Sequence, residues 1–159
     1  MFPRSGFDSP GSPAVAEKLL MRDGRLGEGS PFHEHHGSYV EGVHKDVVIL
    51  PRLWENRLVP VRVEDGSAYG RTGYCIDPVD LCVSKAIAGR EKDRLFVSTL
   101  ADSSIVTAAQ ILERIDRYGI EWPPTYTQDR DLALSRARSW LEHLDSAAAE
   151  HTSRSPCAA

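Results

Sequence analysis

Three basic side chains and one carboxylate lie close together in the middle of the chain and could pair with one another: Lys85, Arg90, Lys92 and Asp93. Apolar residues around them recur every three or four positions, which predicts one helix over residues 78–100. Asp93 falls on the apolar face of that helix. A carboxylate there should be at least partly buried, and a buried charge persists only if it is paired.

The start of this helix is marked clearly. Asp77 can cap the first amides, Pro78 suits the first helical position, and Asp80 places a negative charge where the helix dipole favours one. The charges further along have two interpretations that the pattern leaves open. They can form an ordinary solvated face stabilised by weak pairs one turn apart, or a cluster held against a packed surface.

The order of residues carries a resemblance to a known family. The motif Asp80-Leu-(x)3-Lys-(x)2-Ala-Gly-Arg-x-Lys-Asp93 follows the approach Gly73-Tyr-Cys-Ile-Asp-Pro78, and two earlier blocks agree in the same order, at 29–39 and 50–60. From about residue 26 to about 122 the chain resembles the C-terminal half of a bacterial nucleotidyltransferase-like family of unknown function. That family is related to the antitoxin-type nucleotidyltransferases of abortive-infection toxin–antitoxin systems.

The resemblance also shows what is missing. Polymerase-β-like nucleotidyltransferases carry an Asp-x-Asp on a strand, where residues i and i+2 share a face and can hold magnesium ions together. In the family this element precedes the 29–39 block, but residues 1–25 contain no such pair. The only Asp-x-Asp is Asp129-Arg-Asp131, which we expect to open a helix, where the two acids point apart.

The resemblance implies roles for the central cluster. In a complete protein that transfers nucleotides, Lys85 would contact phosphate or position the acceptor, with Mg²⁺ and a nucleoside triphosphate as cofactors. Arg90 and Lys92 would add positive potential, and Asp93 would orient Lys85 or a partner helix. Lys85 and Asp93 can equally be a structural ion pair that holds the helix to the sheet. Without the paired strand acids we expect this polypeptide alone to transfer nothing.

A rival interpretation is a non-catalytic, antitoxin-like interaction protein. It would bind a protein partner, either a toxin or the missing catalytic half, through the face that the lost half leaves open. Its mark would be an exposed apolar patch on a strand edge. A further alternative is that residues 1–25 are not the native N-terminal half, because of a misplaced start codon or a frameshift.

Composition fits one modest domain of the reduced cytoplasm. The chain has 159 residues and a net charge of −4, which gives no general reason to expect nucleic-acid binding. Its three cysteines show no Cys-x-x-Cys pairing, and no segment is apolar enough for a signal peptide or a membrane span. We expect a disordered or non-matching segment at 1–25, one domain at 26–145 and a disordered tail at 146–159.

The remaining pattern predicts an α+β domain in which short strands precede a C-terminal three-helix region, as part of a polymerase-β-like nucleotidyltransferase fold. Strand candidates are 47–50, 57–63 and 72–76, spaced for an antiparallel meander. A second helix should run from a capping box at Thr107 to Gly119. A third should follow Thr127 with these residues inward: Leu132, Ala133, Ala137, Trp140, Leu141 and Leu144.

Two smaller constellations have competing interpretations. His33-Glu-His-His36 offers ligand types for zinc or nickel, which Cys75 could complete, but neither a His-x(3)-His spacing nor a cysteine pair supports a metal site. In the resembling family this block is a loop. Trp54 and Arg57 could stack a base. We favour Trp54 as a core anchor of a turn, with Arg57 paired to a nearby acid.

Overall fold

The computed structural model describes residues 21, 24–39, 48–64, 66 and 69–154, with side chains described as far as 146. The chain divides into two compact units. Unit 1 comprises Met1–Val48 and Arg62–Tyr74, and unit 2 comprises Ile49–Val61 and Cys75–Ala159. Most of the predicted N-terminal segment, 1–25, lies outside the described residues, as does residue 47 of the first predicted strand, 47–50. Of that strand's described residues only Leu50 is in a strand, β1 (Leu50–Pro51).

In unit 1, α2 (Pro31–His36) is a short capped helix. The Ser30 hydroxyl accepts the amide of His33, and Gly37 ends the helix in the left-handed conformation at φ 64°. The block that the resemblance treats as a loop is therefore helical here. A second feature is a bulge before β3 (Thr72–Cys75). Val63 donates to the Arg71 carbonyl and accepts from Gly70, whose φ of 78° needs glycine.

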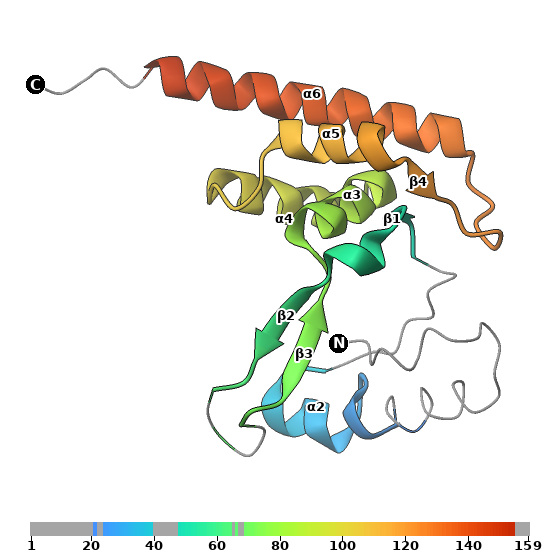
Figure 1. Cartoon of the computed structure of the whole chain (residues 1–159), viewed down its shortest axis with the longest axis vertical. Helices are drawn as coiled ribbons and strands as arrows, with labels where there is room; N and C mark the ends of the chain where they lie inside the picture. The colour runs from blue at the N-terminus through green and yellow to red at the C-terminus, as the bar shows by residue number, and fades with distance from the viewer. Residues whose placement is uncertain (1–20, 22–23, 40–47, 65, 67–68, 155–159) are drawn as a thin grey trace, which may run out of the picture. The chain divides into compact units, whose positions relative to one another are not determined.

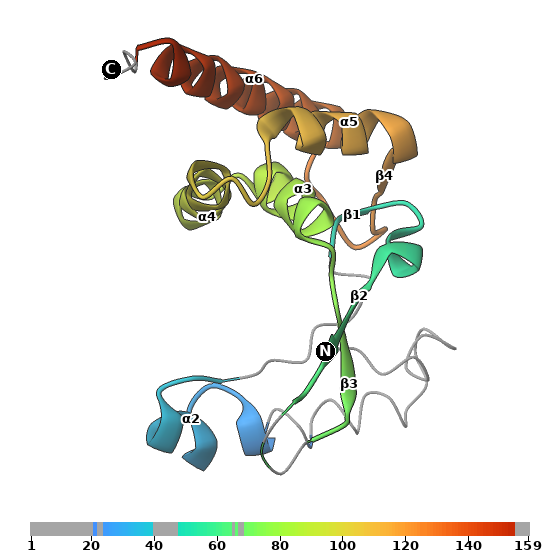
Figure 2. The ribbon, with the colours of Figure 1, turned by 60° about the vertical axis from the view of Figure 1, so that its left-hand side comes forward.

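The helices of unit 2 lie in layers, with α6 on α5 and α5 above α3 (Figures 1 and 2). Their bounds are α3 Pro78–Ala88, α4 Glu91–Asp102, α5 Ala108–Tyr118 and α6 Arg130–Arg154. Apolar side chains from all four helices and from β1 and β4 close one core: Ile49, Cys82, Val83, Ala86, Ile87, Val97, Val106, Ala108, Ile111, Ile115, Ile120, Ala133, Ala137 and Leu141. The mixture of helix and sheet agrees with the predicted α+β class.

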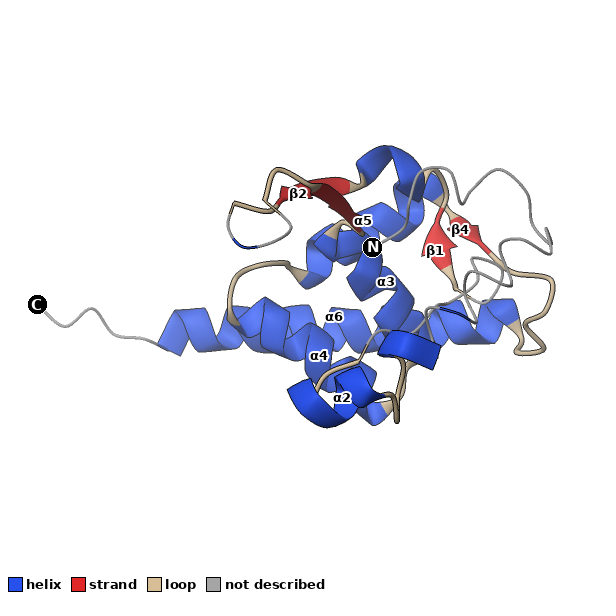
Figure 3. Ribbon diagram, turned by 90° about the horizontal axis from the view of Figure 1, so that it is seen from below, coloured by secondary structure: helices blue, strands red, loops and turns tan. Residues whose placement is uncertain are grey.

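The strands do not form the predicted meander. β2 (Val59–Arg62) pairs with β3, but β1 (Leu50–Pro51) pairs antiparallel with β4 (Ile120–Glu121), far along the chain. Figure 3 shows β1 and β4 side by side. The Gly119 carbonyl accepts the amide of Arg52 and so extends this pairing. A strand of two residues shows no periodicity, so β4 could not be predicted from the pattern of residues.

The predicted helix over 78–100 is in fact two helices, which makes the C-terminal region four helices rather than three. Gly89 caps α3 in the left-handed conformation at φ 64°, donating its amide to the Lys85 carbonyl, and Arg90 is extended at ψ 156°. The change of direction also rotates the expected apolar face. Phe96, which a single helix over 78–100 would place on the same apolar face as Asp93, is 38% exposed, while Val97 is fully buried.

The last two helices follow their predictions closely. α5 begins at the capping box of Thr107 and Gln110 and ends at Gly119. Of the residues predicted to lie inward on α6 all are buried or half-buried except Leu132, which is 49% exposed in the first turn. The helical conformation continues to Arg154, past Ser146, where a disordered tail was expected. The alanines at 147–149 have the highest helix propensity, which accounts for the extension. Within the described residues, no helix has both the length and the apolar character needed to cross a membrane.

Candidate functional site

Asp93 is the centre of the predicted cluster and is 1% exposed. The Lys85 ammonium donates to Asp93 Oδ1 at 2.9 Å, and Arg90 Nε donates to Asp93 Oδ2. The prediction that this carboxylate is buried and paired is therefore confirmed. Because Lys85 lies near the end of α3 and Asp93 in the first turn of α4, their ion pair joins two helices across the Gly89 break, rather than a helix to the sheet, whereas Arg90 is the N-cap residue of α4 itself.

The basic members of the cluster remain open to solvent. The side chain of Lys85 is 33% exposed and that of Arg90 is 62% exposed. Lys92 is exposed too and forms no ion pair with a residue that the structure describes. The Lys85 ammonium also lies 5.9 Å from the centroid of the Phe96 ring. The buried Asp93 thus holds Lys85 and Arg90 at the surface, and Lys92, which pairs with no described residue, lies beside them.

The protonation of Asp93 follows from these contacts. Burial by itself raises the pKa of this carboxyl group, but the hydrogen bonds from Arg90 and Lys85 outweigh burial and hold its pKa below the ordinary value. The hydrogen bond to Asp93 in turn raises the pKa of Arg90. Asp93 is therefore negative near neutral pH while it accepts hydrogen bonds from two basic side chains.

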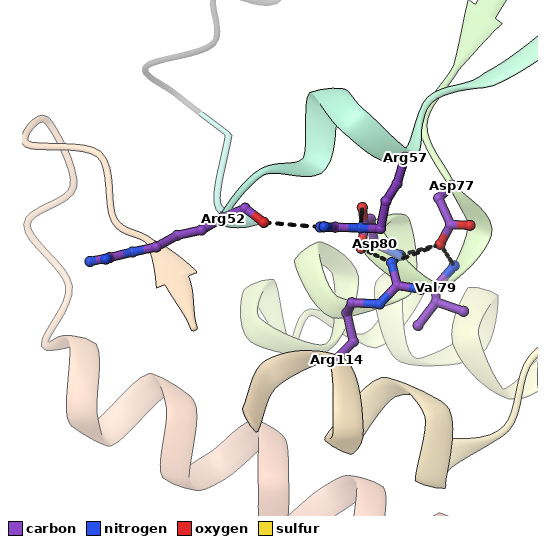
Figure 4. A network of polar contacts seen from close by, with 6 residues as sticks. All are labelled: Arg52, Arg57, Asp77, Val79, Asp80 and Arg114. Atoms are coloured by element: carbon purple, nitrogen blue, oxygen red, sulfur yellow. Dashed lines mark hydrogen bonds and ion pairs between the residues drawn. The ribbon is translucent and has the colours of Figure 1, made fainter. Parts of the chain in front are cut away.

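A second buried carboxylate, Asp80, was missed as a site by sequence reasoning, which treated it only as a dipole partner. It is 0% exposed and accepts from Arg57 Nε at 2.9 Å and from Arg114 Nη1. Arg114 Nη1 also lies 3.2 Å from Asp77, which caps the amides of Val79 and Asp80 (Figure 4). The spacing of the sequence held one signal of this burial. Asp80 lies three and seven residues before Val83 and Ile87, so all three fall on the same buried face of the helix.

Further contacts complete the arrangement around Arg57. Its guanidinium lies 4.1 Å from the centroid of the Tyr118 ring, and its Nη2 donates to the Arg52 carbonyl at 3.1 Å. Trp54, in the short 3-10 helix η3 (Trp54–Arg57), is 5% exposed. The predicted roles of Trp54 as a core anchor and of Arg57 as the partner of an acid are confirmed. Since Asp80 is satisfied by two guanidinium groups, this network is a structural clamp between η3, α3 and α5.

The other constellations do not assemble into sites among the described residues. His33 Nδ1 accepts a hydrogen bond from the amide of Gly29 at 2.9 Å, so this ring nitrogen is already used within the turn that precedes α2. Nowhere in the described part of the chain do three or more His, Cys, Asp or Glu side chains gather as a metal site would require. Asp129 accepts the amide of Leu132 at 2.8 Å, which confirms that the Asp129-Arg-Asp131 pair marks a helix start.

Comparisons of the chain with protein-family models, with curated proteins and with solved structures found no match.

Proposed function

We propose that this chain is the C-terminal portion of a nucleotidyltransferase-like protein, and that its cluster at the α3–α4 junction contacts the phosphates of a nucleoside triphosphate. The ordered motifs between residues 26 and 122 support the kinship. In this proposal the polypeptide transfers no nucleotide alone, because it lacks the paired strand acids.

One observation carries the proposal: the cluster holds more positive charge than Asp93 neutralises, and that charge is exposed. Lys85 and Arg90 already share one carboxylate, and Lys92 adds a third cation beside them. The two terminal amino groups of Arg90 form no hydrogen bond with a described residue, so they are available to donate hydrogen bonds to a phosphate oxygen. Asp93 fixes the direction of Lys85 and Arg90, which reduces the entropy lost when an anion binds.

Magnesium, which the resemblance implies, has no fitting donor pair among the described carboxylates. Asp80 and Asp93 are each bound by two basic groups, and Asp129 is engaged as a helix cap. We therefore derive no metal-dependent step for this chain and assign it phosphate contacts only.

Thermal melts with and without each nucleoside triphosphate and Mg²⁺ test the proposal. A ligand that binds the folded state raises the melting temperature. We expect a rise for the wild type and a smaller rise for Lys92→Gln, which removes a cation that supports no described contact. Arg136→Gln is the matched control, since it removes an equally exposed charge from α6. Equal shifts in both variants, or no shift in the wild type, would contradict the assignment.

A second candidate function is favoured by β2. Val59 is 38% exposed and Val61, two residues on and so on the same face of the strand, is 48% exposed. Pro60 between them cannot donate to a further strand. These side chains match the exposed apolar patch expected of an antitoxin-like protein that binds a protein partner.

This candidate is tested with a photo-crosslinking amino acid at position 61 of the full chain, expressed in its native host. One partner protein should be captured from position 61 but not from position 113, which is also exposed, on α5. The same capture from both positions, or none from position 61, would refute binding through β2.

A further inference from the structure

The outward face of α4 carries a short stripe of exposed side chains, in which the Thr99 hydroxyl donates to the Leu95 carbonyl at 2.8 Å. Lys92, Leu95, Thr99 and Asp102 follow one another at intervals of three, four and three residues, which places them on one side of the helix. All four are exposed, and Leu95 is 68% exposed. This set is called the α4 stripe below.

The opposite side of α4 is the one that packs. Asp93 and Val97 are buried there, and α4 makes its main contacts with α3. Figure 2 shows α4 at the outside of the helical layers of unit 2, with α3 between it and α5. The α4 stripe therefore faces away from the core of its own unit.

The charges of the α4 stripe are placed against the helix dipole. Lys92 stands at the N-terminal end and Asp102 at the C-terminal end, whereas the dipole favours the reverse. Neither forms an ion pair with a residue in the described part of the chain, although the inward charges of the same helix are all paired. Only a partner that presents the opposite order of charges would make this order favourable.

A second copy of α4 in the antiparallel direction presents that order. We propose that two copies of this chain associate through their α4 stripes about a twofold axis that passes between Leu95 and Thr99. Lys92 of each copy then lies opposite Asp102 of the other, and Leu95 opposite Thr99, so every contact occurs twice. The antiparallel arrangement also places the two helix dipoles head to tail.

The size of the α4 stripe sets the strength of this association. A helix of 12 residues is about 18 Å long, so the contact is smaller than the ~1,200–2,000 Å² of a stable specific interface. Phe96, 38% exposed beside the stripe, adds apolar surface. Glu91 flanks the stripe near its N-terminal end and faces Ser103 of the second copy, so it opposes no like charge. The expected dimer is weak and forms with rising concentration.

Sedimentation equilibrium of the full chain, from micromolar to near-millimolar concentration at low salt, tests the proposal. The wild type should dimerise reversibly, and Leu95→Asp should remain monomeric. Lys92→Asp and Asp102→Lys should each weaken the dimer at least about tenfold, because each loses two exchanged pairs and gains like charges. The double variant Lys92→Asp/Asp102→Lys should restore association, and Thr99→Leu should strengthen it.

Two controls keep the outcome decisive. Each substituted residue is exposed, so the helical content of each variant should match that of the wild type, and neither charge reversal should lower the melting temperature, because each restores the charge that the helix dipole favours. Arg136→Asp, on the exposed side of α6, should leave the dimer unchanged. A wild type that stays monomeric throughout, a double variant no tighter than the two single ones, or a Leu95→Asp variant that still dimerises would overturn the proposal.

Discussion

Asp80→Asn is the substitution that tests the structural clamp most sharply. Asp80 is wholly buried, and its two oxygens accept from Arg57 and Arg114. An asparagine of nearly the same shape keeps one acceptor but removes the negative charge. Two guanidinium groups, whose side chains are only 16% and 18% exposed, are then left beside a neutral residue.

The magnitude follows from the burial of the partners. Breaking a buried ion pair by removing one member lowers the free energy of unfolding by about 3–5 kcal/mol. The lower end applies here, since both arginines keep some solvent and Arg114 retains Asp77. A loss of about 3 kcal/mol corresponds to a fall in melting temperature of about 12 °C in a domain of about 100 residues.

Urea unfolding followed by circular dichroism provides the assay. Glu113→Gln is the matched control, because it breaks the 3.8 Å pair with Arg117 in which both side chains are about 70% exposed, and should change the free energy by less than about 0.5 kcal/mol. Adding Arg57→Met to Asp80→Asn should recover part of the loss by removing an unpaired cation. A loss below about 1 kcal/mol for Asp80→Asn would refute the clamp.

Three more predictions follow from the same structure. The pKa of Asp93 is lowered in the folded state, so its pairs stabilise the protein above the unfolded pKa of about 4, and this stability is lost as pH falls through the folded pKa. The difference in free energy of unfolding between the wild type and Asp93→Asn should therefore shrink in acid. A constant difference between pH 7 and pH 2 would contradict the lowered pKa. Burial, and to a smaller extent the charge of Asp77, raises the pKa of Cys82 to about 11. In a Cys157→Ser background an alkylating reagent at pH 8 should therefore modify the exposed Cys75 alone. Rapid loss of both thiols would contradict the burial of Cys82. Gly89→Ala should lower the free energy of unfolding by about 1–2 kcal/mol, because alanine is strained at a φ of 64°. The added Cβ itself would meet only ordinary contacts, at 3.6 and 3.7 Å. An unchanged stability in thermal or urea unfolding would show that the break between α3 and α4 tolerates a side chain.

Local signals in the sequence predicted the helical elements well. The capping box at Thr107 and the glycine at 119 fixed both ends of α5, since both act within one turn. The helix predicted over 78–100 runs through Gly89, whereas in the structure Gly89 ends α3 as a left-handed cap, the same local signal that ends a helix elsewhere. The pairing of β1 with β4 could not be predicted, because a contact between residues 50 and 121 has no local periodicity.

Of the two buried charge clusters, only the one around Asp93 could be recognised from the sequence. Asp93 and its basic partners lie within nine residues of one another, so a paired cluster was one of the two interpretations that the spacing allowed. The clamp around Asp80 draws on Arg57 and Arg114, which are 23 and 34 residues away. Such partners depend on how η3, α3 and α5 pack, which the pattern of one helix does not contain.

The central proposal, that the cluster at the α3–α4 junction contacts nucleoside triphosphates, is tested most directly by calorimetric titration of the purified chain with each triphosphate and Mg²⁺. The proposal predicts saturable binding by the wild type, weaker binding by Lys85→Gln and by Lys92→Gln, and unchanged binding by Arg136→Gln. An absence of binding heat with all four triphosphates, or the same affinity in all three variants, would contradict it.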